Sequence, residues 1–133
     1  MTQKKFLLNL LKNNKKAIII GSLGTISKDL PDDKRVIKVK GAMGCAIGVG
    51  LGYALGTKKK VIVVIGDGAF LMKMGSMATI LAYKPKNLRV IILNNDCYAS
   101  TGGQKINFYA LRALSGKSNH RICGAEIKRV SQS

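Results

Sequence analysis

Two apolar runs, joined by an amphipathic segment, form the centre of this chain. Val61 to Ile65 is continuous, rich in β-branched residues and of the length typical of a strand buried on both faces. Leu88 to Leu93 has the same character, and the turn-forming residues 84–87 precede it. Between the runs, apolar residues recur at helical spacing and leave Lys73 for solvent: Phe70, Leu71, Met74, Met77, Ala78 and Leu81. The pattern predicts a strand, one helix and a second, parallel strand.

The N-terminal third shows the same alternation of helix and strand. Apolar residues at helical spacing predict a short amphipathic helix over Gln3 to Lys12. Ala17 to Ile20 and Val36 to Val39 are short apolar runs that predict two further strands. We therefore expect one α/β domain over residues 1–133, with a mostly parallel sheet.

A second long apolar stretch, Gly41 to Gly56, raises the question of a membrane span. It covers 16 residues between Lys40 and Lys58, whereas a span needs about 20. Glycine recurs at every fourth position, which predicts a helix face with almost no side chains: Gly44, Gly48, Gly52 and Gly56. We expect most of these glycines to let the helix pack closely on the sheet, and we expect no membrane span.

Charge is the unusual feature of the composition. The chain has 23 Lys and Arg against six acids, a net charge of +17. Nucleic-acid binding is one interpretation, but no aromatic residues are interleaved with the lysines as stacking platforms, which disfavours it. Attraction of anionic substrates and cofactors, or complementarity to an acidic partner subunit, explains the charge equally well.

The cysteines and the N-terminus bear on the compartment. Cys45, Cys97 and Cys123 are odd in number and lack Cys-x-x-Cys spacing, which favours reduced thiols in a cytoplasm over a disulfide frame or a zinc site. Met1 to Lys16 alternates lysines with a short apolar stripe and shows no signal peptide. We expect a cytoplasmic protein.

Polar residues stand at the ends of the two central strands. Asp67 lies between Gly66 and Gly68, where the backbone can approach a ligand closely, and Asn95 ends the neighbouring strand. One carboxylate and one amide oxygen suit Mg²⁺, which completes its octahedron with phosphate and water. Backbone amides after Gly66, at the start of the helix that includes Ala69, favour an anion. A magnesium-bridged diphosphate fits this set. The alternative is a plain glycine turn beside a polar strand end.

Gly-Asp-Gly at a strand end, followed at this spacing by Asn-Asn after an apolar run, resembles the signature of thiamine diphosphate-dependent 2-oxo acid decarboxylases and their relatives. The resemblance implies a three-layer α/β/α fold. It also implies that Asp67 and the Asn95 side chain bind Mg²⁺ together with the backbone carbonyl oxygen of Cys97, and that thiamine diphosphate is the cofactor.

Two other turns share this resemblance. Gly41-Ala42-Met43-Gly44 is similar to the family's Gly-Ser-Met-Gly turn, which implies that Met43 wedges between the cofactor rings and that the Gly41 carbonyl accepts from the pyrimidine amine. Ala42 replaces the usual serine and loses its hydroxyl. The loop containing Gly21, Ser22 and Gly24 resembles the family's Gly-x-x-Gly loop and is a candidate phosphate contact, or else a plain turn.

The segment after Asn95 narrows the resemblance. Its Ser-Thr-Gly-Gly-Gln run, residues 100–104, resembles the sulfopyruvate and phosphonopyruvate decarboxylase branch. We also expect Tyr98 to be a cofactor-binding residue. Ser100 and Thr101 are candidates for the diphosphate, with a solvated loop as the alternative.

Residues 105–133 are weakly patterned. Phe108 to Leu114 predicts a short helix, and Ser115 to Ser133 is polar and basic without clear periodicity. The resembled family continues with a further helix and a closing strand, so we expect the C-terminal part to be shortened. A natural small subunit, a truncation and a frame-shifted end all remain open.

The activating glutamate of the resembled family also bears on the partner. Glu126, the one glutamate, lies in the weakly patterned tail. In the family that glutamate belongs to a separate pyrimidine-binding domain, and this chain begins directly with the diphosphate-binding one. We therefore expect a hetero-oligomer that decarboxylates a small anionic 2-oxo acid and is inactive without a pyrimidine-binding subunit. An acetolactate synthase-like carboligase and a non-catalytic module are the alternatives.

Overall fold

The computed structural model describes residues 1–108, 121–122 and 124–131. Six strands form one sheet in the order β2-β1-β3-β4-β8-β7. All neighbours are parallel except β7 and β8, which pair antiparallel. The strands are β1 (Ile18–Gly21), β2 (Val36–Lys38), β3 (Val61–Gly66), β4 (Leu88–Asn94), β7 (Arg121–Ile122) and β8 (Ala125–Arg129).

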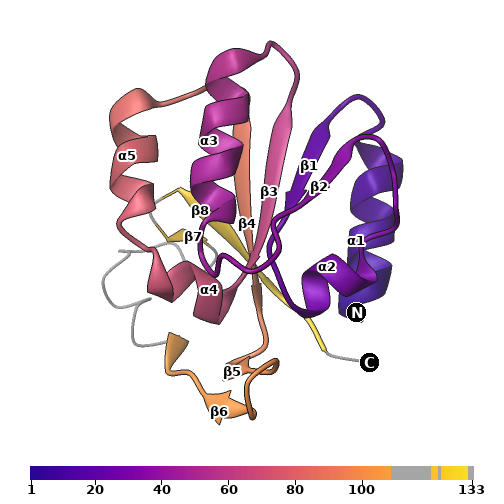
Figure 1. Cartoon of the computed structure of the whole chain (residues 1–133), viewed down its shortest axis with the longest axis vertical. Coiled ribbons are helices and arrows are strands. Elements are labelled where there is room, and N and C mark those ends of the chain that lie inside the picture. Colours follow the sequence, from indigo (N-terminus) through magenta and orange to yellow (C-terminus); the bar gives the residue numbers. More distant parts are fainter. Residues whose placement is uncertain (109–120, 123, 132–133) are drawn as a thin grey trace.

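Helices cover both faces of this sheet (Figure 1). The described helices are α1 (Gln3–Asn13), α2 (Thr25–Asp29), α3 (Ala46–Gly56), α4 (Asp67–Met72) and α5 (Ser76–Tyr83). The first two pack on one face, and the last three on the other. The expected three-layer α/β/α fold with a mostly parallel sheet is confirmed.

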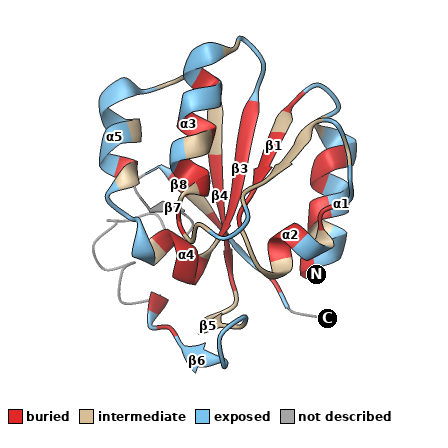
Figure 2. Cartoon of the chain, viewed as in Figure 1, coloured by how far each residue is buried: buried red, intermediate tan, exposed pale blue. Residues whose placement is uncertain are grey.

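Successive side chains of β3 point to opposite faces of the sheet, so this strand packs against both helical layers. Val63 and its alternate neighbours pack with α3, α4 and α5, whereas Ile62 and Val64 pack with α1 and α2. All five residues from Val61 to Ile65 have no exposed surface, and β3 is buried along almost its whole length in Figure 2. The continuous apolar run thus has its physical cause in burial on both faces.

The single helix predicted between these strands is wrong, because the structure has two. Helix α4 ends at Met72, and α5 begins at Ser76. A Cβ built on Gly44 would lie 2.5 Å from Cγ of Lys73, so the Lys73 stem packs against that backbone. Gly75, a poor helix former, follows in the break. Apolar periodicity continued across the break and concealed it.

The glycine-lined helix face also differs from the prediction. A Cβ added to Gly48, Gly52 or Gly56 would meet nothing within 4 Å, so these glycines face open space. Gly50 instead lies against the sheet, where a Cβ would come 2.1 Å from Cγ2 of Val63. Gly44 precedes the helix with a φ of +85°. Among the described residues, no helix has the length and apolar character to cross a bilayer.

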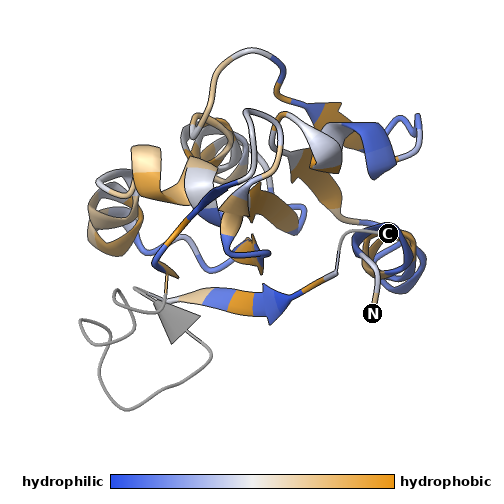
Figure 3. Cartoon of the chain, turned by 90° about the horizontal axis from the view of Figure 1, so that it is seen from below, coloured by the Kyte–Doolittle hydropathy of each residue, from blue (hydrophilic) through white to orange (hydrophobic). Residues whose placement is uncertain are grey.

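The tail contains the closing strand that we expected to be missing. Strand β8 pairs in parallel with β4, with Ile92 opposite Ile127. Buried Ala125 and Ile127 alternate with polar residues, an alternation visible in Figure 3 along the strand that leads to the C-terminus. The strand is only five residues long, and its charged residues hide the alternation in the sequence. Most of the predicted helix from Phe108 to Leu114 lies outside the described residues.

Candidate functional site

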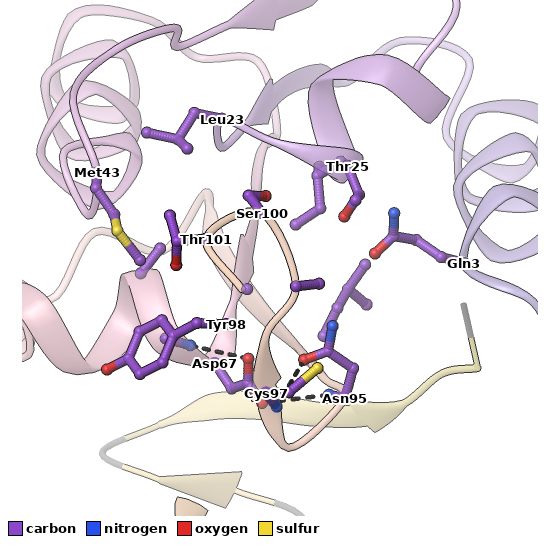
Figure 4. A pocket seen from close by; sticks show the side chains of 16 residues that line it. Gln3, Leu23, Thr25, Met43, Asp67, Asn95, Cys97, Tyr98, Ser100 and Thr101 are labelled. Atoms are coloured by element: carbon purple, nitrogen blue, oxygen red, sulfur yellow. Dashed lines mark hydrogen bonds between the residues drawn. The ribbon is translucent and has the colours of Figure 1, made fainter. Parts of the chain in front are cut away.

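The connections of the sheet place a crevice between β1 and β3. From β1 the chain moves outward to β2, and from β3 it moves in the opposite direction to β4. Ligands of open α/β sheets bind at the carboxyl ends of strands where the order reverses. A cavity of about 80 Å³ lies there, lined by residues that follow β1, β3 and β4 (Figure 4).

The Asp67 carboxylate is one of the groups that line this cavity. It is only 2% exposed and is the first residue of α4. Its Oδ1 accepts from the Gly68 amide at 2.8 Å. Its Oδ2 accepts from the amides of Asp96 at 2.8 Å and Asn95 at 3.2 Å. The carboxylate therefore links the end of β3 to the end of β4.

A sharp turn after β4 aims these amides. Asp96 has a φ of +59°, a left-handed conformation that Asp tolerates better than most residues. The Asn95 side-chain Oδ1 accepts from the Cys97 amide at 3.2 Å, so the amide oxygen stays close to the turn. Asp67 and Asn95 thus lie on the same edge of the sheet, as the sequence predicts.

Burial is the largest influence on Asp67 and raises the pKa of its carboxyl. The three amide hydrogen bonds lower that pKa, and the charge of Asp96 raises it. None of the described residues that line the cavity is a lysine or an arginine. A buried carboxylate without a cationic neighbour fits a site for a cation, because a bound ion would supply the missing positive charge.

The donor set narrows the kind of cation. Within the described chain, no group of three or more His, Cys, Asp or Glu side chains could hold a metal ion. An ion at Asp67 would depend on neutral oxygens, such as Oδ1 of Asn95, and on oxygens from a ligand or water. That combination suits Mg²⁺ and argues against zinc.

The cavity gathers most of the predicted site residues. Those that line it are Met43, Gly66, Asp67, Gly68, Ala69, Asn95, Cys97, Tyr98 and Ser100. Gly24 does not line it but lies beside it, because a Cβ there would come 2.7 Å from Oγ of Ser100. Four further predicted residues also lie outside the lining: Gly21, Ser22, Gly41 and Ala42. For all of these residues the cofactor contact itself stays a prediction.

Some lining residues were absent from the predicted set. Leu23 lies in the glycine-bounded loop after β1, and Thr25 follows that loop as the first residue of α2, so the loop carried the signal. Gln3 also lines the cavity, is 4% exposed, and donates from Nε2 to Oδ2 of Asp29 at 2.7 Å. A single glutamine in an amphipathic helix gives no sequence signal for such a role.

The size of the cavity limits what this chain encloses alone. Cofactor pockets typically measure about 300–1,000 Å³, several times the roughly 80 Å³ found here. The hairpin of β5 (Cys97–Tyr98) and β6 (Gln104–Lys105) covers one side. A Cβ on Gly68 would lie 2.5 Å from Cε1 of Tyr98, which shows how closely that ring covers the turn. A larger ligand must extend beyond this cavity or displace the hairpin.

Comparison with known proteins defines the class. The family model for the thiamine pyrophosphate enzyme, C-terminal TPP binding domain, matches residues 22–128. The chain therefore belongs to this family. The X-ray structure of a protein isolated from Mycobacterium smegmatis shares the fold with a TM-score of 0.62 and 21% identity, over 80% of this chain and 23% of that one.

Curated relatives belong to a narrower group. The chain is 45% identical over 93 residues to sulfopyruvate decarboxylase subunit beta of Methanocaldococcus jannaschii, covering 68% of this chain and 50% of that protein. It is 39% identical over 117 residues to phosphonopyruvate decarboxylase of Streptomyces hygroscopicus, covering 82% of this chain and 29% of that protein. The chain thus spans half or less of the length of these relatives.

Proposed function

We propose that this chain is the diphosphate-binding, beta-type subunit of a thiamine diphosphate- and Mg²⁺-dependent decarboxylase that acts on a small anionic 2-oxo acid. Convergence of Asp67 and Asn95 on one edge of the sheet, at the switch point of the family fold, is the observation that carries the proposal. The names of the relatives favour sulfopyruvate or phosphonopyruvate as the substrate.

Residues of the chain divide the work of holding the cofactor. Asp67, the Asn95 side chain and the carbonyl of Cys97 would hold Mg²⁺. The amides at the start of α4 and the hydroxyl of Ser100 would hold the diphosphate. Met43 lines the cavity and would support the cofactor rings through its flexible thioether. When bound, thiamine diphosphate supplies the carbon that adds to the 2-oxo group and takes up the charge left when CO₂ departs.

A partner is required for the acid that activates the cofactor. Asp67 is the one carboxylate among the described lining residues, and the metal would occupy it. Glu126 lies in β8, where its two carboxylate oxygens accept from Arg89 at 2.7 Å each. We infer that a pyrimidine-binding subunit supplies the activating glutamate, which agrees with the name "subunit beta" of the relatives.

The substrate's anionic group needs a cation from outside the cavity lining. Since no described lining residue is basic, the carboxylate and sulfonate or phosphonate of such a substrate would be bound by the partner subunit.

Cys45 and Cys97 are free thiols, and we assign the protein to the cytoplasm on that ground.

Activity assays of the chain alone and of the complex with its partner subunit test the proposal. We expect the complex, loaded with thiamine diphosphate and Mg²⁺, to release CO₂ and an aldehyde from sulfopyruvate or phosphonopyruvate, and the chain alone to be inactive. Acetolactate as the product from pyruvate would identify a carboligase instead. A complex that binds no cofactor would identify a non-catalytic module.

A further inference from the structure

A concave surface rich in lysine lies at the edge of the sheet opposite the candidate site. It is hollowed to about 880 Å³ and lined by residues 12–17 and 57–60, at the amino ends of β1 and β3 (Figure 1). Six lysines line it: Lys12, Lys15, Lys16, Lys58, Lys59 and Lys60. All six are exposed. We call these six residues and their hollow the lysine surface.

Two loops form this surface, residues 57–60 and residues 12–17, and Asn87 holds the first of them. Its Nδ2 donates to three backbone carbonyls, those of Ala54 at 2.9 Å, Thr57 at 2.8 Å and Lys59 at 3.0 Å. These bonds fix the backbone between the end of α3 and the start of β3. The lysines of residues 58–60 therefore project from a positioned loop.

Arg35 holds the second loop, residues 12–17, through its backbone carbonyls. Its Nη1 donates to the carbonyls of Asn14 at 3.2 Å and Lys15 at 3.0 Å. Lys60 joins the two loops, because its Nζ donates to Oδ1 of Asn14 at 3.0 Å. A polyanion that binds here meets a backbone that is already positioned, so binding costs little ordering entropy of the backbone.

Nothing acidic in the described chain neutralises this surface. Its lining contains no Asp or Glu, and within the described residues none of the six lysines forms an ion pair. Each of the chain's six acids has a partner other than these lysines: Asp29 with Gln3, Asp32 with Lys38, Asp33 with the Arg35 that holds the second loop, Asp96 with Arg129, Glu126 with Arg89, and Asp67 at the candidate site. The positive potential of the hollow is therefore uncompensated.

The lining chemistry indicates the ligand. It has no aromatic side chain on which a base could stack, and no arginine whose fork could pair bidentately with phosphate. Lysines alone provide mobile point charges, which suit many carboxylates at unspecified positions. A second copy of this chain, at +17, would be repelled.

We propose that the lysine surface docks an acidic, Asp- and Glu-rich segment of a partner protein. The proposal rests on the proposed function only in requiring a partner, and it lies apart from the cofactor chemistry at Asp67. Docking at this edge would leave the carboxyl ends of the strands free for the cofactor.

The test uses the full chain and a short, fluorescein-labelled oligoglutamate peptide as the probe, with affinity measured by fluorescence anisotropy at about 50 mM salt. The variant Lys58→Gln/Lys59→Gln should bind about tenfold more weakly, since each exposed charge pair contributes modestly. The matched control is Lys4→Gln/Lys5→Gln, which removes two exposed charges from the opposite end of α1. It should bind within about twofold of the unaltered chain.

Equal losses in the two variants would overturn the proposal, since the peptide would then respond to net charge alone. A short DNA duplex that binds more tightly than the peptide, and depends on Lys58 and Lys59, would also overturn it in favour of a nucleic-acid surface. Magnesium-dependent binding of thiamine diphosphate, measured on the same variants, should not change. If the unaltered chain showed no magnesium-dependent binding of thiamine diphosphate, the proposed function would be refuted and the docking result would stand.

Discussion

The backbone amide of Asn95 donates to Oδ2 of Asp67 across 3.2 Å, although 28 residues separate them in the chain. The bond forms because β3 and β4 are parallel neighbours, with Gly66 opposite Leu93. Both strands therefore present their following residues at one edge. The same arrangement leaves a buried carboxylate without a basic neighbour, which is the physical reason to expect a metal ion there.

Helix α3 offers a matched pair of glycine substitutions. Gly50→Ala places a Cβ 2.1 Å from Cγ2 of Val63, inside the buried contact between α3 and the sheet. We expect it to lower the free energy of unfolding by about 1–3 kcal/mol. Gly52→Ala meets nothing within 4 Å and should raise it by up to about 1 kcal/mol. Urea denaturation measures both, and equal effects would contradict the packing described.

The Arg89–Glu126 pair joins β4 to the tail strand β8, with both hydrogen bonds at 2.7 Å. Glu126→Gln should lower the free energy of unfolding by about 1 kcal/mol, because one charge-assisted pair is weakened at a partly exposed position. Cofactor affinity and turnover of the complex should stay unchanged, since Glu126 lies outside the cavity lining.

A double-variant cycle with Arg89→Gln separates the pair from other contacts of Glu126. Loss of turnover in a stably folded Glu126→Gln complex would show that Glu126, rather than a partner residue, activates the cofactor.

Acid should weaken the loop near the lysine surface through Asp33. Hydrogen bonds from the Arg35 side chain and backbone lower the pKa of Asp33 from 3.8 to about 2. A lowered folded-state pKa stabilises the fold above pH 3.8, and this contribution disappears as the pH falls towards about 2.

The melting temperature measures this effect. Asp33→Asn should melt below the unaltered chain at neutral pH, and the two melting curves should converge as the pH falls towards about 2. A constant difference across that window would show that ionisation of Asp33 is not involved.

Strong local patterns made the centre of the fold predictable. The run from Val61 to Ile65 and the polar residues after each strand fixed β3, β4 and their shared edge, because strands buried on both faces allow few alternatives. The resemblance predicts Met43 at the site, and Tyr98 is one of the predicted cofactor-binding residues; both line the cavity.

Prediction from the sequence failed where tertiary contacts determine the structure. Spacing of four residues singled out Gly48 and Gly52, but the rotation of α3 on the sheet presents Gly50 instead. Strand β8 is short, and only its pairing with β4 reveals it. Gln3 reaches the cavity only because α1 packs beside α2, a contact that local pattern does not encode.

The most direct test of the account is calorimetric titration of thiamine diphosphate into the purified chain, with and without Mg²⁺. Asp67→Ala is the test variant, and Asp32→Ala is the control, because Asp32 is fully exposed and pairs only with Lys38 among the described residues. Circular dichroism checks that both variants fold.

We predict that binding to the unaltered chain and to the control requires Mg²⁺, with at least about tenfold weaker affinity without it, and that folded Asp67→Ala loses this magnesium dependence. Equal binding with and without Mg²⁺, or unchanged binding by Asp67→Ala, would contradict the account.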